Sequence, residues 1–228
     1  MRSDRAADVA SLDDRFDIVT VDVGLPSGIV RIARPRSADQ LISEADFARD
    51  ERLPYWADVW PSSTVLAGIV DALAGSGRRA LELGCGVGLV TVAAMRAGFH
   101  VLATDYYAEA LLFARRNARS ATGREPATRL ADWRAMPPGL GRFDLVLASD
   151  VLYEREYATL VADALVATLA PRGMALVADP GRTALLSFIT ACEQRNLAVG
   201  VRAKVPWRDG SAKQTITIHE VTARGGAP

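Results

Sequence analysis

Apolar and polar residues alternate near the start of the chain, as in a strand that buries one face. The alternation covers Phe16–Val23 and resumes at Ile29–Ile32, and Gly24–Gly28 between them has the glycine, proline and serine of a turn. We therefore predict a small β-hairpin. Residues 38–52 are charged and weakly amphipathic, which predicts a helix, with a lid as one interpretation. Two prolines interrupt the aromatic run over 53–61 and indicate an ordered loop.

From Pro61 onward, short apolar runs alternate with segments of helical periodicity. The expected helices cover 61–75, 87–97, 108–120, 157–169 and 183–195. The expected strands cover 79–83, 99–104, 128–131, 143–149, 173–179, 198–205 and 214–222. This alternation predicts an α/β fold with a doubly wound sheet that is mostly parallel. Only Trp207–Ser211 was expected to join the last two strands, which is too short for a parallel crossover, so we predict an antiparallel C-terminal pair.

These elements divide the chain into a main domain and a small N-terminal extension of hairpin and helix. The expected boundaries are a mobile tail over 1–15, the hairpin and lid-like segment over 16–57, the main domain over 58–222 and a tail over 223–228.

Composition narrows the classes of function. The chain has 228 residues, 50% of them hydrophobic and 24% charged, which excludes global disorder. Lys plus Arg and Asp plus Glu are both 27, and a net charge of zero argues against binding of nucleic acid or anionic membranes. Two Cys and two His lack metal-ligand spacing, so no metal is expected. With no long apolar run and no signal-peptide pattern, we expect a cytoplasmic protein.

The strongest local signal is the glycine-rich segment that leaves the first strand of the main domain. Glu82-Leu-Gly84-Cys85-Gly86-Val-Gly88 combines glycines, which let backbone approach a ligand, with an acid just before them. In open α/β sheets this position lies outside the carboxyl ends of the strands, where ligands bind. Asp105 ends the next strand, where a carboxylate can accept hydrogen bonds from both hydroxyls of a ribose.

Three nucleotide-type ligands compete for this loop. A nucleoside triphosphate requires a Gly-Lys-Ser/Thr ending, which is missing from the loop. A dinucleotide requires a third glycine where Leu89 stands, and its pyrophosphate disfavours a neighbouring acid such as Glu82. The ammonium and sulfonium of S-adenosylmethionine are compatible with that acid, so the loop favours S-adenosylmethionine. A glycine turn without a ligand is the structural alternative.

Five motifs carry a family resemblance: Val59–Ser63, Leu81–Leu89, Thr104–Asp105, Ala131–Trp133 and Ser149–Tyr153. The chain resembles the class I, seven-β-strand S-adenosylmethionine-dependent methyltransferases over roughly residues 53 to 222. The resemblance is narrower to the methyltransferase-like group of protein-lysine methyltransferases, and to bacterial relatives of the enzyme acting on the electron-transfer flavoprotein β subunit. It implies a Rossmann-like sheet of seven strands.

The resemblance implies a cofactor site. Backbone of the glycine loop contacts the methionine part, Asp105 the ribose, and Trp133 the adenine, with Asp132 near its amine. Trp60 covers the cofactor from the N-terminal side. The implied cofactor-binding residues are Trp60, Glu82, Gly84, Cys85, Gly86, Gly88, Asp105, Asp132, Trp133 and Ser149. Core packing for Trp133 and anchoring of the N-terminal segment for Trp60 are the alternative interpretations.

The resemblance also implies that Asp150 and Tyr153 face the methyl acceptor, as catalytic residues. A carboxylate stabilises an ammonium, so we assign Asp150 to binding and orienting an amine rather than to acting as a strong base. In the alternative interpretation, Asp150 caps the following helix and Tyr153 packs. A protein lysine is the first choice of acceptor and a small, nicotinamide-like amine the second. A non-catalytic cofactor-binding protein and a nicotinamide-dinucleotide oxidoreductase are the alternative classes.

Overall fold

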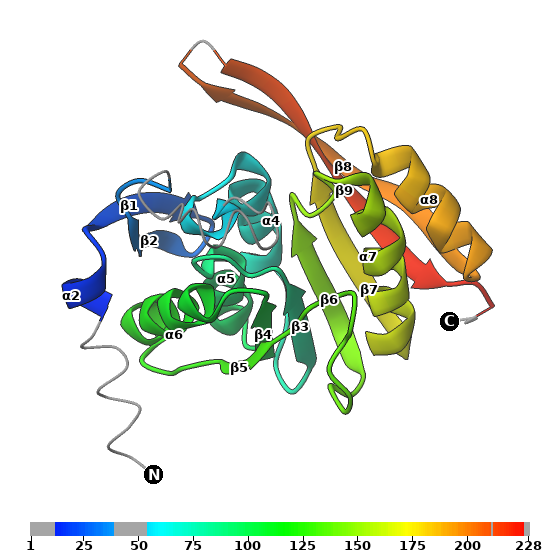
Figure 1. Ribbon diagram of the computed structural model, residues 1–228, viewed down its shortest axis with the longest axis horizontal. Helices are drawn as coiled ribbons and strands as arrows, with labels where there is room; N and C mark the ends of the chain where they lie inside the picture. Colours follow the sequence, from blue (N-terminus) through cyan, green and yellow to red (C-terminus); the bar gives the residue numbers. More distant parts are fainter. Residues whose placement is uncertain (1–11, 39–53, 211, 226–228) are drawn as a thin grey trace.

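A computed structural model describes residues 12–38, 54–210 and 212–225. Seven strands form the central sheet, in the order β5-β4-β3-β6-β7-β9-β8 (Figure 1). The strands are β3 (Arg79–Leu83), β4 (His100–Asp105), β5 (Ala127–Leu130), β6 (Phe143–Ser149), β7 (Leu169–Asp179), β8 (Leu197–Asp209) and β9 (Ala212–Ala223). The first five are parallel, and β9 pairs antiparallel with both β7 and β8. The predicted fold class is confirmed.

Helices cover both faces of this sheet (Figure 1). One apolar cluster joins residues of α4, α5 and α6 to one face, and a second joins α7 and α8 to the other. The five helices are α4 (Pro61–Asp71), α5 (Leu89–Arg96), α6 (Ala108–Thr122), α7 (Arg155–Thr168) and α8 (Leu185–Gln194). None of the helices in the described ranges is long and apolar enough to cross a membrane. The central strands β3, β4, β6 and β7 are therefore largely buried, as their apolar sequences require.

The N-terminal hairpin consists of β1 (Ile18–Leu25) and β2 (Gly28–Pro35), which pair antiparallel as predicted. Buried Asn117 of α6 fixes it to the main domain. The amide of Asn117 accepts a hydrogen bond from the Ala33 N–H at 2.8 Å and donates to the carbonyls of Ala33 and Val87, each at 2.8 Å. Because Val87 belongs to the glycine loop, one side chain ties the hairpin to the site.

Three expectations differ from the structure or lie outside it. Leu12–Arg15 form a helical turn, α2, with Leu12 fully buried, where polar residues predicted a mobile tail. The helix expected over 38–52 lies almost wholly outside the described residues. Strands β8 and β9 extend further than predicted, so Trp207 lies inside β8 rather than in a connection. Local propensity missed this extension because tertiary packing of one ribbon face stabilises it.

Candidate active site

The glycine loop leaves β3 at the point where the strand order reverses, between β4 on one side and β6 on the other. Gly84 and Gly86 have φ angles of 68° and 51°, in the left-handed region that favours glycine. A Cβ on Gly86 would come within 3.0 Å of the Trp56 carbonyl oxygen, so the N-terminal loop packs directly on the glycine backbone. The sequence therefore needs glycine here both for conformation and for close approach.

Asp105 ends β4 beside this loop. Its carboxylate is 5% exposed and accepts hydrogen bonds from the Gly86 N–H at 2.9 Å and the Tyr107 N–H at 3.0 Å. Burial raises the pKa of Asp105 to about 6, and the backbone donors oppose that rise. These backbone bonds fix the orientation of the carboxylate, and its oxygens have further lone pairs for ligand hydroxyls.

Two predicted cofactor residues do not line the cavity beside the loop. Glu82 is 1% exposed, and its carboxyl accepts a hydrogen bond from the Thr91 hydroxyl of α5. Burial raises the pKa of Glu82 to about 8. Gly88 begins α5, and a Cβ there would lie 2.6 Å from the Ala114 Cα of α6. Glu82 and Gly88 thus support the loop from behind, and direct contact with a cofactor stays a prediction for both.

Two tryptophans and an acid contribute to other parts of the cavity wall. Trp133 follows β5, and its ring meets Tyr157 of α7 edge to face, with 5.5 Å between centroids. Asp132, beside it, forms a salt bridge with Arg134 at 2.9 Å. Trp60 stands immediately before α4 and donates from its indole N–H to the Tyr55 carbonyl at 2.8 Å.

Asp150 follows β6 and is the most constrained acid of the site. Its φ of 57° is left-handed, an uncommon conformation for a residue other than glycine. Its carboxylate accepts hydrogen bonds from the Arg182 Nε at 2.8 Å and from the Ser62 hydroxyl at 3.2 Å. The N-cap of α7 is Glu154, with no side-chain cap bond, so the alternative of Asp150 as a helix cap does not hold.

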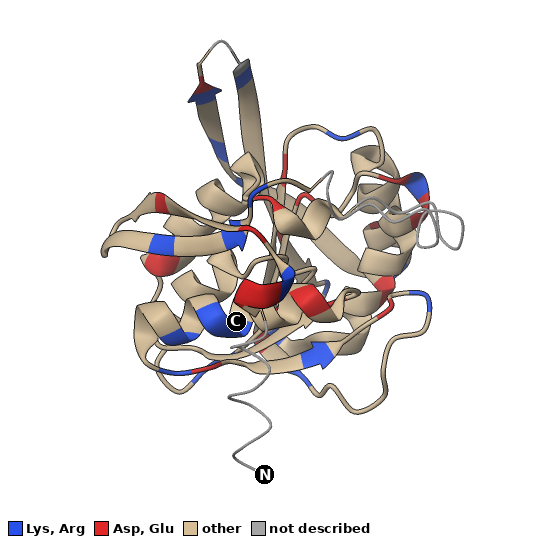
Figure 2. Cartoon of the chain, turned by 60° about the vertical axis from the view of Figure 1, so that its left-hand side comes forward, with Lys and Arg blue, Asp and Glu red and all other residues tan. Residues whose placement is uncertain are grey.

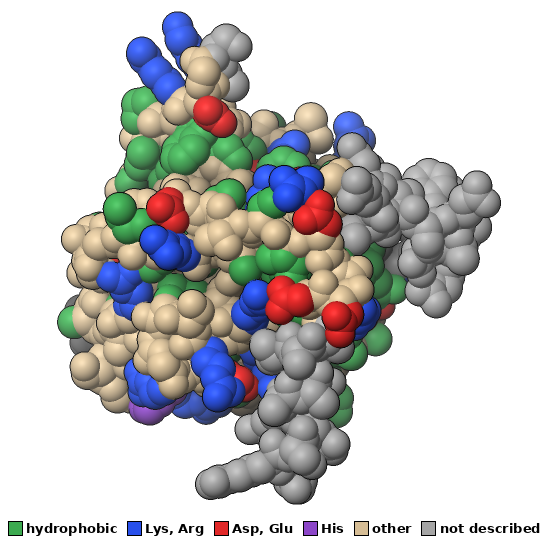
Figure 3. Space-filling view, turned by 90° about the vertical axis from the view of Figure 1, so that its left-hand side faces the viewer, with side chains coloured by type: hydrophobic (Ala, Val, Ile, Leu, Met, Phe, Trp, Pro, Cys, Tyr) green, Lys and Arg blue, Asp and Glu red, His purple; other side chains and the backbone are tan. Residues whose placement is uncertain are grey.

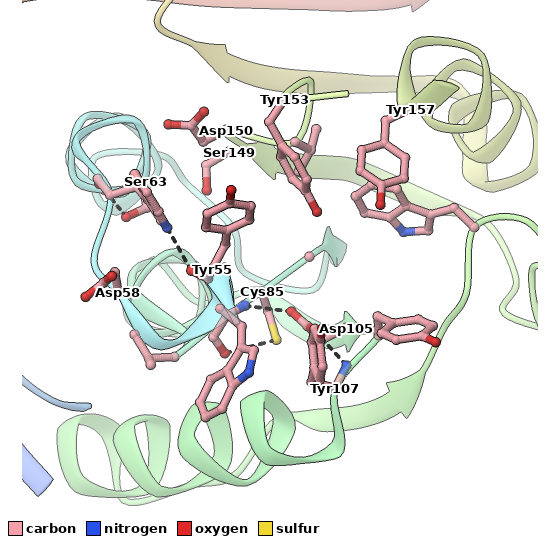
Figure 4. A pocket seen from close by; sticks show the side chains of 18 of the residues that line it. Tyr55, Asp58, Ser63, Cys85, Asp105, Tyr107, Ser149, Asp150, Tyr153 and Tyr157 are labelled. Carbon is pink, nitrogen blue, oxygen red and sulfur yellow. Dashed lines mark hydrogen bonds between the residues drawn. The ribbon is translucent and has the colours of Figure 1, made fainter. Parts of the chain in front are cut away.

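Tyr153 lies three residues further along the same loop and is 37% exposed. Its ring contacts Tyr55 and Tyr157 edge to face, with centroids 5.3 Å and 4.9 Å apart. Figure 4 shows these three rings on the side of the cavity opposite Asp105. The three tyrosine rings therefore form one aromatic cluster in the cavity wall.

The cavity comprises about 940 Å³ of empty space, which includes open solvent at its mouth. Its wall includes ten of the twelve predicted site residues: Trp60, Gly84, Cys85, Gly86, Asp105, Asp132, Trp133, Ser149, Asp150 and Tyr153. Burial raises the pKa of the Cys85 thiol well above its usual value, which keeps it protonated and unsuited to nucleophilic attack.

Sequence reasoning missed several residues of the site. Tyr55 lines the cavity from the N-terminal loop, and Tyr157 lines it from the first turn of α7. Arg182 contacts Asp150 from a loop that is 32 positions away in sequence. The signal that could have found Arg182 is topological, because parallel neighbours β6 and β7 end side by side at one edge.

The fold and the site together define a class of protein. The structure has a switch point in a mostly parallel sheet, a glycine loop, a carboxylate after the next strand and an indole beyond it, which are the features that the predicted resemblance implied. Residues 80–173 match the family described as "Methyltransferase domain". Residues 80–173 therefore match a methyltransferase domain, and the predicted resemblance to S-adenosylmethionine-dependent methyltransferases and the predicted cofactor are confirmed.

Particular relatives support the same assignment. The chain is 32% identical over 133 residues to the electron transfer flavoprotein beta subunit lysine methyltransferase of Xenopus laevis. The matched segment covers 57% of this chain and 53% of the relative. It is 30% identical over 115 residues to the protein-lysine methyltransferase METTL21E of Mus musculus, covering 45% and 47%. The chain thus spans about half the length of the curated relatives it matches.

Solved structures share the fold. A ribosomal protein L11 methylase from Lactobacillus delbrueckii has a TM-score of 0.57 at 21% identity, over 73% of this chain and 81% of that chain. The magnesium protoporphyrin IX methyltransferase of Synechocystis, with bound S-adenosylmethionine, has a TM-score of 0.57 at 17% identity, over 82% and 95%.

Proposed function

We propose that the protein is an S-adenosylmethionine-dependent N-methyltransferase that acts on a lysine side chain of another protein. The observation that carries the proposal is one cavity at the carboxyl ends of β3 to β6 that joins Asp105 and Trp133 to Asp150 and Tyr153. The relatives named for lysine methylation match this chain at about 30% identity, which supports a lysine over a small amine.

The donor set fits the cofactor. Asp105 presents a fixed carboxylate to vicinal hydroxyls, and the left-handed glycine backbone opens space for the amino-acid part. Trp133 offers an indole face or edge to an adenine ring. When bound, the cofactor supplies a methyl group already activated on a sulfonium, so the protein's work is to align the acceptor and exclude water.

The acceptor amine must be neutral when it attacks, although a free lysine has a pKa near 10.4. A lone carboxylate opposes this, because it stabilises the ammonium. In this structure Arg182 already offsets the charge of Asp150, with an N–O distance of 2.8 Å. The pair therefore accepts a hydrogen bond from the amine and stabilises an ammonium less than a free carboxylate does. Tyr55, Tyr153 and Tyr157 surround the aliphatic part of the side chain.

Incubation of cell extract with methyl-labelled cofactor tests the proposal. We expect the wild-type protein to label a protein band, and the Asp150→Ala variant to label it at least tenfold more slowly. Calorimetry with S-adenosylhomocysteine should show nearly equal affinity for both proteins, because Asp150 faces the acceptor. Label confined to the small-molecule fraction would instead identify the small-amine activity, and undiminished labelling by Asp150→Ala would remove that residue from the mechanism.

A further inference from the structure

The β8–β9 hairpin projects past the edge of the sheet at which the cavity opens. Asp179, the last residue of β7, pairs with Thr217 of β9, and Thr217 pairs with Lys204 of β8. Residues 205–209 of β8 and 212–216 of β9 therefore extend beyond the carboxyl end of β7, by about 17 Å for five residues in each strand. Figure 1 shows this hairpin, in orange, reaching out past the neighbouring strands.

One face of this hairpin is packed. Cross-strand partners in an antiparallel pair share a face, and the register places Ala203 with Ile218 and Val205 with Ile216. Both isoleucines are fully buried, and Ala203, Val205 and Trp207 pack against the apolar cluster that contains residues of α4. Packing of this face explains why the strands continue beyond the sheet and holds the hairpin in place.

The opposite face is basic. Arg208 pairs directly with Lys213, and Lys204 lies on the same face, with Pro206 and Thr215 paired between them. We call Lys204, Arg208 and Lys213 the cationic face. All three are exposed, and none takes part in an ion pair among the residues that the structure describes. Figure 2 marks basic positions along both strands of this hairpin, and Figure 3 shows basic side chains near its tip, with an acidic one close by.

This concentration of charge is unfavourable for the isolated chain. Like charges directly opposite each other on two strands destabilise the pairing of those strands. The chain as a whole has a net charge of zero, so the cationic face is a local feature and not the effect of a basic protein. An acidic partner would convert the repulsion into attraction, and it would be held beside the mouth of the cavity.

We propose that the cationic face binds an acidic segment of the acceptor protein while an acceptor lysine enters the cavity. The proposal rests on the proposed function, because it names the substrate as a lysine-bearing protein with acidic residues near the modified site. A peptide fits better than nucleic acid, because Trp207 packs on the apolar face and cannot stack on bases from the cationic one.

Fluorescence anisotropy with a labelled peptide of ten glutamates around one central lysine tests this docking without any turnover. We expect the triple variant Lys204→Gln, Arg208→Gln, Lys213→Gln to bind the peptide at least tenfold more weakly at low salt. We expect the wild-type protein to lose a similar factor between low and high salt, and the triple variant to lose much less. The double variant Lys204→Arg, Lys213→Arg keeps the charge and should bind as the wild type.

A matched control removes the same charge elsewhere. Arg124, Arg129 and Arg172 are also exposed and lie away from the hairpin, and their triple Gln variant should bind the peptide normally. Equal loss in both triple variants, no loss in the first, or no peptide binding by the wild type would overturn the docking proposal. Tighter competition by single-stranded DNA of equal charge would overturn it in favour of a nucleic acid.

The test separates docking from catalysis. S-adenosylhomocysteine should raise the melting temperature of both triple variants as it does that of the wild type, which shows that each is folded with its cofactor site intact. Peptide binding that depends on the cationic face, without label transfer to any protein, would preserve the docking site and reject the lysine methyltransferase function. If the variant without the cationic face transfers label to protein as fast as the wild type, the methyltransferase function would be kept and the docking site rejected.

Discussion

At the residue scale, the two acids Asp105 and Asp150 of the candidate site lie in different environments. Asp105 is buried and bonded only by backbone donors, whereas Asp150 has a guanidinium and a hydroxyl as partners. The first arrangement leaves a negative charge available to neutral hydroxyl donors. In the second arrangement, Arg182 balances the charge of Asp150 before an acceptor binds. This suits the proposed role of Asp150, because an unbalanced carboxylate would stabilise the acceptor amine as an ammonium.

Cofactor affinity should therefore depend on the protonation of Asp105. Burial raises the pKa of Asp105 to about 6, so at pH 5 only about one molecule in ten keeps the carboxylate that we expect to accept the ribose hydroxyls. We expect affinity for S-adenosylhomocysteine, measured by calorimetry, to fall about tenfold between pH 7.5 and pH 5. Asp105→Asn should bind more weakly at pH 7.5 and lose this pH dependence. A wild-type affinity that is the same at both values would contradict the role of Asp105.

Arg182 provides a second test, on the pH dependence of turnover. Without it, the Asp150 carboxylate would stabilise the acceptor ammonium more strongly and raise the pH at which the neutral amine forms. We expect Arg182→Gln to shift the rising limb of the pH–rate profile upward by about one unit, while affinity for S-adenosylhomocysteine is unchanged. Arg182→Lys keeps the charge and should largely restore the wild-type profile. An equal loss of rate at every pH would indicate a structural role only.

At the element scale, the packing of α5 on α6 sets the position of the glycine loop. The loop runs straight into α5, and Gly88 at that junction touches the backbone of Ala114 in α6. Asn117, one turn further along α6, bonds the Val87 carbonyl in the loop. The loop is thus fixed from behind by one helix, whose other contacts carry the N-terminal hairpin.

Substitution of Gly88 should disrupt this junction. Gly88→Ala would combine a φ of 87° with a Cβ 2.6 Å from the Ala114 Cα, and we expect a loss of about 3 kcal/mol in the free energy of unfolding. Gly77→Ala is the matched control, because its φ of 75° carries similar backbone strain while no atom lies within 4 Å of the added Cβ. Denaturant unfolding of both variants should show the larger loss for Gly88→Ala. Equal losses would mean that packing against α6 contributes nothing.

At the scale of the whole molecule, the sequence predicted what depends on periodicity and local chemistry. Alternating strands and helices, the antiparallel C-terminal pair and the glycine loop all follow from residue pattern, and the structure has them. Features that depend on contacts between distant parts of the sequence could not be predicted from the residue pattern. Arg182 reaches Asp150 only because β6 and β7 are neighbours, and the length of the β8–β9 hairpin depends on packing against the main domain.

The buried acids also set how the stability of the whole molecule depends on pH. Burial raises the pKa of Glu82 to about 8, against an ordinary value of 4.5, so the folded state retains a proton that the unfolded state releases. Where the native state binds more protons, the free energy of unfolding decreases as pH rises. The stabilising contribution of protonated Glu82 is therefore complete below about pH 4.5 and is lost as pH rises to about 8.

Glu82→Gln should remove this contribution, because an amide carries no charge at any of these pH values and its oxygen can still accept from Thr91. Melting curves should show the variant several degrees more stable than the wild type at pH 8.5, and close to it at pH 5. Asp71 offers a control, since this buried acid is bonded by the N–H and hydroxyl of Ser27, each at 2.7 Å, and its replacement by Asn should destabilise the protein at pH 8.5. A Glu82→Gln variant that is less stable than the wild type at pH 8.5 would show that Glu82 is held ionised by the fold, and that the acid behind the glycine loop does contribute charge to the cofactor site.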